Sequence, residues 1–197
     1  MERLAECDDA LIGSPLAHLR GREGRRVVAQ SESLWRRRTA WNDVPMGDLQ
    51  PAQGRDGRHR HRDPIELPDG TVVSASSYRK EPVVEGYTPT FGVYLDHRWE
   101  TPWPKILVDW PDFGVPTNAT SLTAALREAL DRARRGELVE VGCLGGHGRT
   151  GTAIACLAVL AGLDGDPVDW ARAAYCDRAV ETAEQEEFVR GFAATAR

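Results

Sequence analysis

The stretch EVGCLGGHGRTG at residues 140–151 constrains the fold of this chain more than any other segment. A β-prone run leads to Cys143, a glycine-rich run follows, and an apolar helical stretch begins near Arg149. Three of the four residues 145–148 are glycine, which lets the backbone curl so that successive N–H groups point inward. The order of strand, glycine loop and helix therefore predicts a backbone cradle for a tetrahedral oxyanion, strengthened by the positive end of the helix.

Two side chains of this stretch carry chemistry. Cys143 stands at the floor of the cradle, where the positive field favours the nucleophilic thiolate at neutral pH. Arg149 can fold back over the loop and hold two phosphoryl oxygens bidentately. The nucleotide-binding P-loop also cradles phosphate, but it has glycine and lysine where this chain has Cys143 and Arg149. The alternative without function is a buried cysteine before a glycine turn, and the surrounding order of elements favours the cradle over it.

Periodicity predicts the elements around this loop. Residues 121–135 place apolar side chains on one helical face, with Gly136 as the C-terminal stop. Short strands are expected at 65–67 and 71–73, joined by an Asp-Gly turn, and at 91–95, 106–108 and 138–141. Further helices are expected at 149–161, from Pro167 with Asp166 as its cap, and at 183–195. This alternation predicts an α/β fold, with a central mixed sheet flanked by helices.

The first third of the chain carries weaker signals. We interpret residues 1–64 as a basic N-terminal extension, partly loop, that packs on a single domain formed by residues 65–197. Seven arginines lie between Arg20 and Arg38 and could bind an anionic partner. A solvated arginine-rich surface is the simpler interpretation of that cluster.

Composition excludes several classes of protein. The net charge of −5 argues against a general affinity for nucleic acid. We expect no membrane segment and no signal peptide, because no long apolar stretch exists. His59 and His61 lack a third metal ligand nearby, so a solvated loop is expected there and no metal. The chain has four cysteines without regular spacing, Cys7, Cys143, Cys156 and Cys176. This pattern indicates neither a disulfide framework nor a zinc site, and we expect a cytoplasmic protein.

Three motifs in order resemble those of the protein tyrosine phosphatase and dual-specificity phosphatase superfamily. Residues 143–151 are similar to its C-x5-R-[ST]-G signature. Upstream, WPDFGVP at 110–116 resembles its mobile acid loop, and downstream 179–188 resembles the segment that supplies a water-positioning glutamine. The resemblance covers about residues 65–197. It implies a cysteine-dependent phosphatase domain that needs no metal or other cofactor.

The resemblance also implies a role for each matched residue. Cys143 is expected to attack phosphorus, Arg149 to clamp the phosphoryl group, and Asp112 to protonate the leaving oxygen and later act as base. Thr150 is expected to hydrogen-bond the departing thiolate, and Gln185 to orient the attacking water. The residues expected to surround the phosphate are Leu144, Gly145, Gly146, His147, Gly148 and Arg149.

Some positions depart from the family pattern or have simpler explanations. Gly142 replaces the histidine that usually precedes the cysteine, which removes one contributor to loop order. Leu144 replaces a small polar residue, and His147 occupies a variable position at the mouth of the loop. Asp112 could be a turn residue, since Pro-Asp-x-Gly is good turn chemistry. Gln185 could equally be an exposed helical residue.

We therefore expect a phosphatase of phosphomonoesters, with protein phosphotyrosine as the first substrate class and dual specificity left open. A small phosphorylated metabolite, nucleotide or inositol phosphate is the alternative substrate. A non-catalytic phospho-binding module is a further alternative, which only the change at Gly142 favours. Cys156 or Cys176 could form a reversible disulfide with Cys143, although ordinary core cysteines are the simpler interpretation.

Overall fold

The computed structural model describes residues 52–53, 60–61, 64–78 and 88–196. These residues belong to one compact unit, Thr39–Arg197. The predicted basic extension, with its arginine cluster, lies almost entirely outside the described residues. Within that region, β1 (Ala52–Gln53) and β2 (Arg60–His61) pair as short antiparallel strands.

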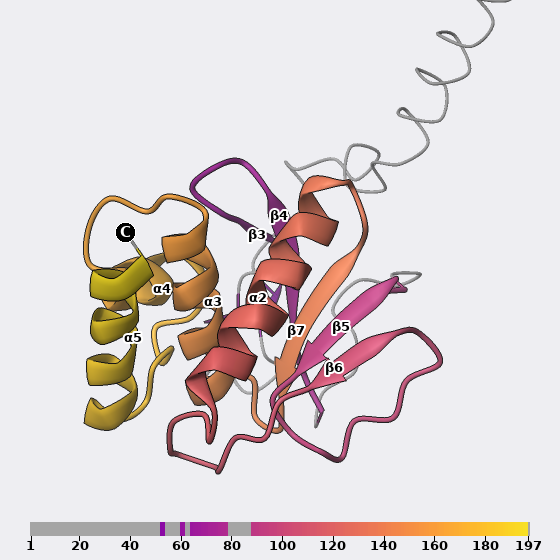
Figure 1. Ribbon diagram of the computed structural model, residues 1–197, viewed down its shortest axis with the longest axis horizontal. Helices are drawn as coiled ribbons and strands as arrows, with labels where there is room; N and C mark the ends of the chain where they lie inside the picture. Colours follow the sequence, from indigo (N-terminus) through magenta and orange to yellow (C-terminus); the bar gives the residue numbers. More distant parts are fainter. Residues whose placement is uncertain (1–51, 54–59, 62–63, 79–87, 197) are drawn as a thin grey trace, which may run out of the picture. The chain divides into compact units, whose positions relative to one another are not determined.

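The remaining strands form one mixed sheet (Figure 1). They are β3 (Ile65–Glu66), β4 (Val72–Ser77), β5 (Phe91–Tyr94), β6 (Lys105–Leu107) and β7 (Val139–Cys143). The strand order is β3-β4-β7-β5-β6, in which β4, β7, β5 and β6 run parallel and β3 is antiparallel to β4. The predicted strands and the α/β mixed sheet are therefore confirmed, with β7 at the centre.

The predicted Asp-Gly turn joins β3 to β4. Gly70 has φ 81, a left-handed conformation that glycine adopts without a steric penalty. The side chain of Asp69 accepts a hydrogen bond of 3.0 Å from the N–H of Thr71. Ile65 pairs with Val73 across the resulting hairpin.

Four helices of the described residues lie beside this sheet, α2 (Ala119–Arg134), α3 (Gly148–Leu160), α4 (Pro167–Ala174) and α5 (Ala183–Ala196). Helices α2 and α3 pack on the sheet and on each other, whereas α4 and α5 pack on α3 (Figure 1). All four predicted helices are confirmed. The predicted cap is confirmed as well, because the carboxylate of Asp166 accepts hydrogen bonds from the N–H groups of Val168 and Asp169.

Strand β7 and helix α3 form the centre of the hydrophobic core. Every residue of β7 is buried, and α3 is buried from Gly148 to Ala158, as expected for a helix that is apolar nearly all round. The central strand ends at Cys143, and the helix begins at Gly148. The loop between them therefore lies at the carboxyl end of parallel strands, where α/β sheets bind ligands.

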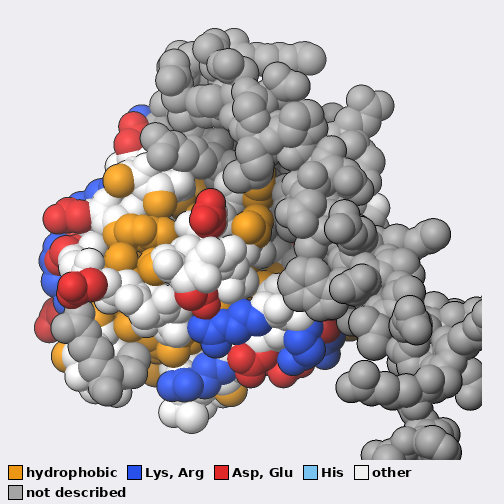
Figure 2. All heavy atoms as spheres, turned by 90° about the horizontal axis from the view of Figure 1, so that it is seen from above, with side chains coloured by type: hydrophobic (Ala, Val, Ile, Leu, Met, Phe, Trp, Pro, Cys, Tyr) orange, Lys and Arg blue, Asp and Glu red, His pale blue; other side chains and the backbone are white. Residues whose placement is uncertain are grey.

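The surface near the C-terminal end of α2 mixes charges of both signs. Arg132 contacts Glu128 and Glu137, and Arg134 contacts Asp69. Figure 2 shows the same kind of mixture on the face it presents, with acidic, basic and hydrophobic side chains close together. Within the described part of the chain, no helix has the length and apolar character needed to cross a bilayer.

Candidate active site

The loop after β7 curls back onto the sulfur of Cys143. The N–H of Gly146 donates to Cys143 Sγ at 3.1 Å, and Cys143 is 3% exposed. Gly146 has φ 76, so this turn needs a residue without a Cβ. Helix α3 begins directly after the loop at Gly148, which adds its positive end to the loop amides. This arrangement agrees with the predicted cradle.

Arg149 joins three segments that lie far apart in the sequence. Its Nη1 donates to the carbonyl oxygens of Leu95 and Trp110, both at 2.9 Å. Its Nη2 lies 3.3 Å from Asp96 Oδ2 and 3.1 Å from Asp112 Oδ1. The guanidinium is 4% exposed, so two carbonyls and two carboxylates fix its plane in a buried position. Arg149 thus brings the predicted acid, Asp112, to the predicted phosphate loop.

The loop that carries Asp112 is a tight turn anchored by Trp110. The indole Nε1 of Trp110 donates to the carbonyl oxygen of Gly114 at 2.8 Å, and the N–H of Gly114 donates to Pro111 at 3.2 Å. Phe113 takes a left-handed conformation with φ 60, which is uncommon for a bulky residue. The carboxylate of Asp112 is 58% exposed and reaches across to Arg149. Its side chain therefore does more than close a turn.

Thr150 and Gln185 are both fully buried. Among the described residues, the hydroxyl of Thr150 finds no hydrogen-bond partner, so the contact expected with the sulfur of Cys143 is not formed in this arrangement. The alternative that Gln185 is an exposed helical residue is wrong. Its Nε2 donates to the carbonyl oxygen of Gly114 at 3.0 Å, and its Oε1 accepts from the N–H of Glu181 at 2.9 Å.

The space around Gly142 explains its departure from the family pattern. A Cβ at this position would lie 2.6 Å from Ser76 Oγ and 2.9 Å from Trp99 Cζ2. Trp99 stacks on Tyr94 with ring centroids 4.1 Å apart. The rings of Tyr78 and Trp99 form a T-shaped contact with centroids 5.6 Å apart. This aromatic group occupies the space that a side chain at position 142 would need.

Two side chains that support the phosphate loop carried no sequence signal. The hydroxyl of Ser77, at the end of β4, donates to the carbonyl oxygen of Leu144 at 3.0 Å. The hydroxyl of Tyr175, just after α4, donates to the carbonyl oxygen of Gly146. Both come from neighbouring elements that no motif links to the loop. Together with Asp96, they are the site residues that sequence reasoning missed.

The three described cysteines, Cys143, Cys156 and Cys176, are all buried, and no disulfide joins any two of them. Burial raises the pKa of the Cys156 thiol, which suits a core residue of α3. The sulfur of Cys176 lies 3.4 Å from Nδ1 of His147. His147 is thereby tied to the segment that follows α4.

A buried carboxyl lies three residues before the nucleophile. Glu140 Oε1 accepts from the hydroxyl of Tyr94 at 2.7 Å, and Nε1 of Trp103 donates to that hydroxyl at 2.8 Å. Burial raises the pKa of Glu140 above its ordinary value, and the hydrogen bond from Tyr94 opposes this shift. The protonated form of Glu140 is therefore favoured relative to an exposed glutamate.

The N–H of Gly146 and the guanidinium of Arg149 are donors of the kind that suit an anion. Within the described ranges, no three His, Cys, Asp or Glu side chains come together as metal ligands. One edge of the sheet thus carries a thiol, a guanidinium and an exposed carboxylate. This set suits nucleophilic attack by the sulfur on the central atom of a bound oxyanion, with the carboxyl group near enough to donate a proton.

Part of the chain is similar to a known protein family and to known proteins. A family model described as "Swiss Army Knife protein, DSP-PTPase phosphatase domain" matches residues 112–192. Two uncharacterised proteins of Methanocaldococcus jannaschii are similar to the chain. MJECL20 is 38% identical over 107 residues, which cover 49% of this chain and 71% of that protein. MJ0215 is 39% identical over 111 residues, which cover 49% and 66%.

Among solved structures, Tk-PTP in its active form is 27% identical to this chain, with a TM-score of 0.48. The match covers 54% of this chain and 80% of Tk-PTP. The range that matches the family model begins at Asp112 and includes the phosphate loop and Gln185.

Proposed function

Because the chain belongs to the dual-specificity type of protein tyrosine phosphatase domains, and is a phosphatase, we propose that it hydrolyses phosphomonoesters through a phosphoryl group on Cys143. The observation that carries this proposal is the contact of Arg149 with Asp112, beside a loop whose Gly146 N–H points at the sulfur of Cys143. The proposed nucleophile, anion clamp and acid are Cys143, Arg149 and Asp112, and these contacts support their assignment.

In the first step, the thiolate of Cys143 attacks phosphorus in line with the leaving oxygen. The S–P bond forms as the P–O bond breaks, and Asp112 gives its proton to the leaving oxygen. Arg149 and the loop amides hold the equatorial oxygens, where charge develops in the transition state.

In the second step, water attacks the phosphoryl group on Cys143. Asp112, now ionised, takes a proton from the water as the S–P bond breaks and inorganic phosphate leaves. We propose that the orphan hydroxyl of Thr150 turns to the departing thiolate, since it is buried with no partner among the described residues. Gln185 is proposed to orient the water, which requires its amide to leave the contacts with Gly114 and Glu181.

Protein phosphotyrosine is the substrate class that we propose first. Two exposed aromatic side chains flank the site and suit a phenyl ring, Tyr78 at 50% and Phe113 at 63% exposure. The N–H of Tyr78 bonds the carbonyl oxygen of Cys143, and Phe113 follows Asp112 directly. A small phosphorylated metabolite, nucleotide or inositol phosphate is the alternative substrate, and the substrate panel includes both classes.

We further propose that residues 65–197 form the phosphatase domain and that residues 1–64 extend it. A cytoplasmic location is proposed as well, because the spacing of the four cysteines does not suggest a disulfide framework.

Hydrolysis of p-nitrophenyl phosphate tests the reaction. We expect activity that vanadate inhibits and EDTA leaves unchanged, no turnover in Cys143→Ser, and a loss of about 100-fold or more in Asp112→Asn. Full activity of Cys143→Ser contradicts the proposal, and phosphate binding without turnover in the natural protein indicates a binding module. The ratio of kcat/KM for phosphotyrosine peptides, phosphoserine peptides and small phosphoesters decides the substrate class.

A further inference from the structure

The amide of Gln185 lies where three segments meet. Its Nε2 donates to Gly114, in the loop of the acid, and its Oε1 accepts from the N–H of Glu181, at the entry to α5. A Cβ on Gly148, at the start of α3, would lie 3.1 Å from the same Oε1. Gln185 therefore contacts the acid loop while packing against the end of the phosphate loop.

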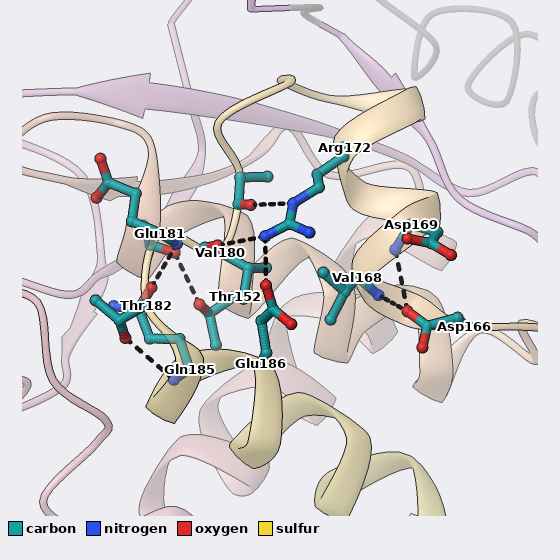
Figure 3. Close-up of polar contacts among 12 residues, drawn as sticks. Thr152, Asp166, Val168, Asp169, Arg172, Val180, Glu181, Thr182, Gln185 and Glu186 are labelled. Carbon is teal, nitrogen blue, oxygen red and sulfur yellow. Dashed lines mark hydrogen bonds and ion pairs between the residues drawn. The ribbon is translucent and has the colours of Figure 1, made fainter.

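The entry to α5 holds Gln185 rigidly from one side. Thr182 Oγ1 accepts from the backbone N–H of Gln185 at 3.2 Å, and the two residues have the spacing of a capping box. Figure 3 shows Gln185 with Thr182 and Glu181 at the first turn of this helix. The side chain is fully buried, so few rotamers are open to it.

Arg172 of α4 fixes the turn that precedes this helix. It donates to the carbonyl oxygens of Ala179 and Val180, at 3.1 and 2.9 Å, and to Glu186 Oε1 at 2.7 Å (Figure 3). Val180 has φ 61, a strained conformation for a β-branched residue. These three bonds hold a turn that the backbone alone would not favour, and so they fix where Gln185 projects.

The loop that carries Asp112 also contacts Gln185, through the carbonyl group of Gly114. The carbonyl oxygen of Gly114 accepts two hydrogen bonds, from Trp110 Nε1 at 2.8 Å and from Gln185 Nε2 at 3.0 Å. The first bond lies within the loop. The second bond ties the loop to α5. Gly114 lies two residues after Asp112, so displacement of this loop would break the second bond and leave a buried amide donor unsatisfied.

We propose that Gln185 is a positioning residue for the general acid. Through the carbonyl of Gly114 it holds the loop of Asp112 over the phosphate loop during the first chemical step. This inference rests on the proposed phosphatase function. It assigns Gln185 a part in the first half of the reaction, distinct from orienting water in the second half.

A series of aryl phosphates separates these two roles. The value of kcat/KM reports only the steps up to release of the first product, whereas kcat includes hydrolysis of the cysteinyl phosphate. Protonation by Asp112 matters for a poor leaving group such as phenol and little for a good one such as 2,4-dinitrophenol. We therefore compare phenyl phosphate with 2,4-dinitrophenyl phosphate in the full chain.

Gln185→Met keeps the side-chain volume and removes the donor to Gly114. We expect its kcat/KM to fall about tenfold or more on phenyl phosphate and less than about twofold on 2,4-dinitrophenyl phosphate. In an Asp112→Asn background, where no acid remains to be positioned, Gln185→Met should change kcat/KM on phenyl phosphate less than about twofold. Glu184→Ala, at the exposed neighbouring position, serves as the matched control and should leave both substrates unaffected.

Two outcomes would overturn the inference. An unchanged kcat/KM with a lower kcat would show that Gln185 acts only on the water. An equal loss on both substrates that persists in the Asp112→Asn background would show a merely structural role. If Gln185→Met does not fold, Gln185→Glu, which replaces the donor by an acceptor, must show the same leaving-group dependence. Turnover by Cys143→Ser would instead contradict the underlying function.

Discussion

The carboxylate of Asp96 lies 3.3 Å from the guanidinium of Arg149, and both side chains are 4% exposed. Asp96 is held in turn by Arg98, whose backbone N–H and Nη1 both donate to it at 3.0 Å. The end of β5 therefore supplies a fixed anion beneath the arginine that is proposed to clamp phosphate. An arginine whose plane is set in advance loses less entropy when substrate binds.

Asp96→Asn should weaken both catalysis and the fold. The amide keeps the volume and removes the charge opposite Arg149, which retains Asp112 and two carbonyl partners. We expect kcat/KM for p-nitrophenyl phosphate to fall about tenfold and the free energy of unfolding to fall by about 2 kcal/mol. Asp164→Asn, at an exposed position, is the control. An unchanged kcat/KM would show that the charge of Asp96 does not support Arg149 in catalysis.

Introducing a side chain at position 142 should lower the free energy of unfolding of the protein. A Cβ there would clash with Ser76 and with the ring of Trp99, so Gly142→Ala is expected to cost about 1–3 kcal/mol of stability. Gly142→His, which restores the family residue, should destabilise at least as much and should not raise activity. Urea unfolding measures both effects.

Gly191→Ala provides the matched comparison. A Cβ at this exposed position in α5 meets nothing within 4 Å, so alanine should stabilise the helix by about 0.5–1 kcal/mol. Equal effects at positions 142 and 191 would mean that the packing around Trp99 does not matter.

The buried carboxyl of Glu140 predicts a pH dependence of stability. Burial raises the pKa of Glu140 in the folded protein, so the folded state favours its protonated form. As pH rises from the ordinary value of 4.5 through the raised pKa, ionisation in the folded state costs stability. Glu140→Gln cannot ionise and keeps an acceptor for Tyr94. The variant should therefore gain stability relative to the natural protein as pH rises above 4.5.

Chemical unfolding of both proteins across that range measures the difference, in which the contributions of all other titrating groups cancel. A difference that stays constant with pH, or that favours the natural protein as pH rises, would contradict the role of burial at Glu140.

Local pattern predicted the part of the site that is local in the sequence. The strand, the glycine turn and the helix from Val139 to Leu160 are contiguous, and their periodicity and glycine content fix them without help from the rest of the chain. Asp112 was found from a short motif for the same reason. Both segments are confirmed as a strand–loop–helix and a tight turn that meet at Arg149.

The supports of the site come from tertiary contacts that no local pattern encodes. Asp96, Ser77 and Tyr175 reach the loop from separate elements, and each residue type is common outside active sites. Gln185 stands among four glutamates, so its surroundings in the sequence suggest solvent, yet Arg172 and the turn at Val180 direct it inward. The consequence of Gly142 likewise depended on the position of Trp99, which the sequence does not reveal.

The central claim is that the phosphoryl group passes through the sulfur of Cys143. Rapid mixing of the protein with p-nitrophenyl phosphate, followed by a denaturing quench and mass spectrometry of its peptides, tests this directly. We predict one phosphoryl group on the peptide that contains Cys143, formed at the rate of the p-nitrophenol burst and absent from Cys143→Ser. Continued hydrolysis without phosphorylation of Cys143, or with the phosphoryl group on another residue, would contradict the account.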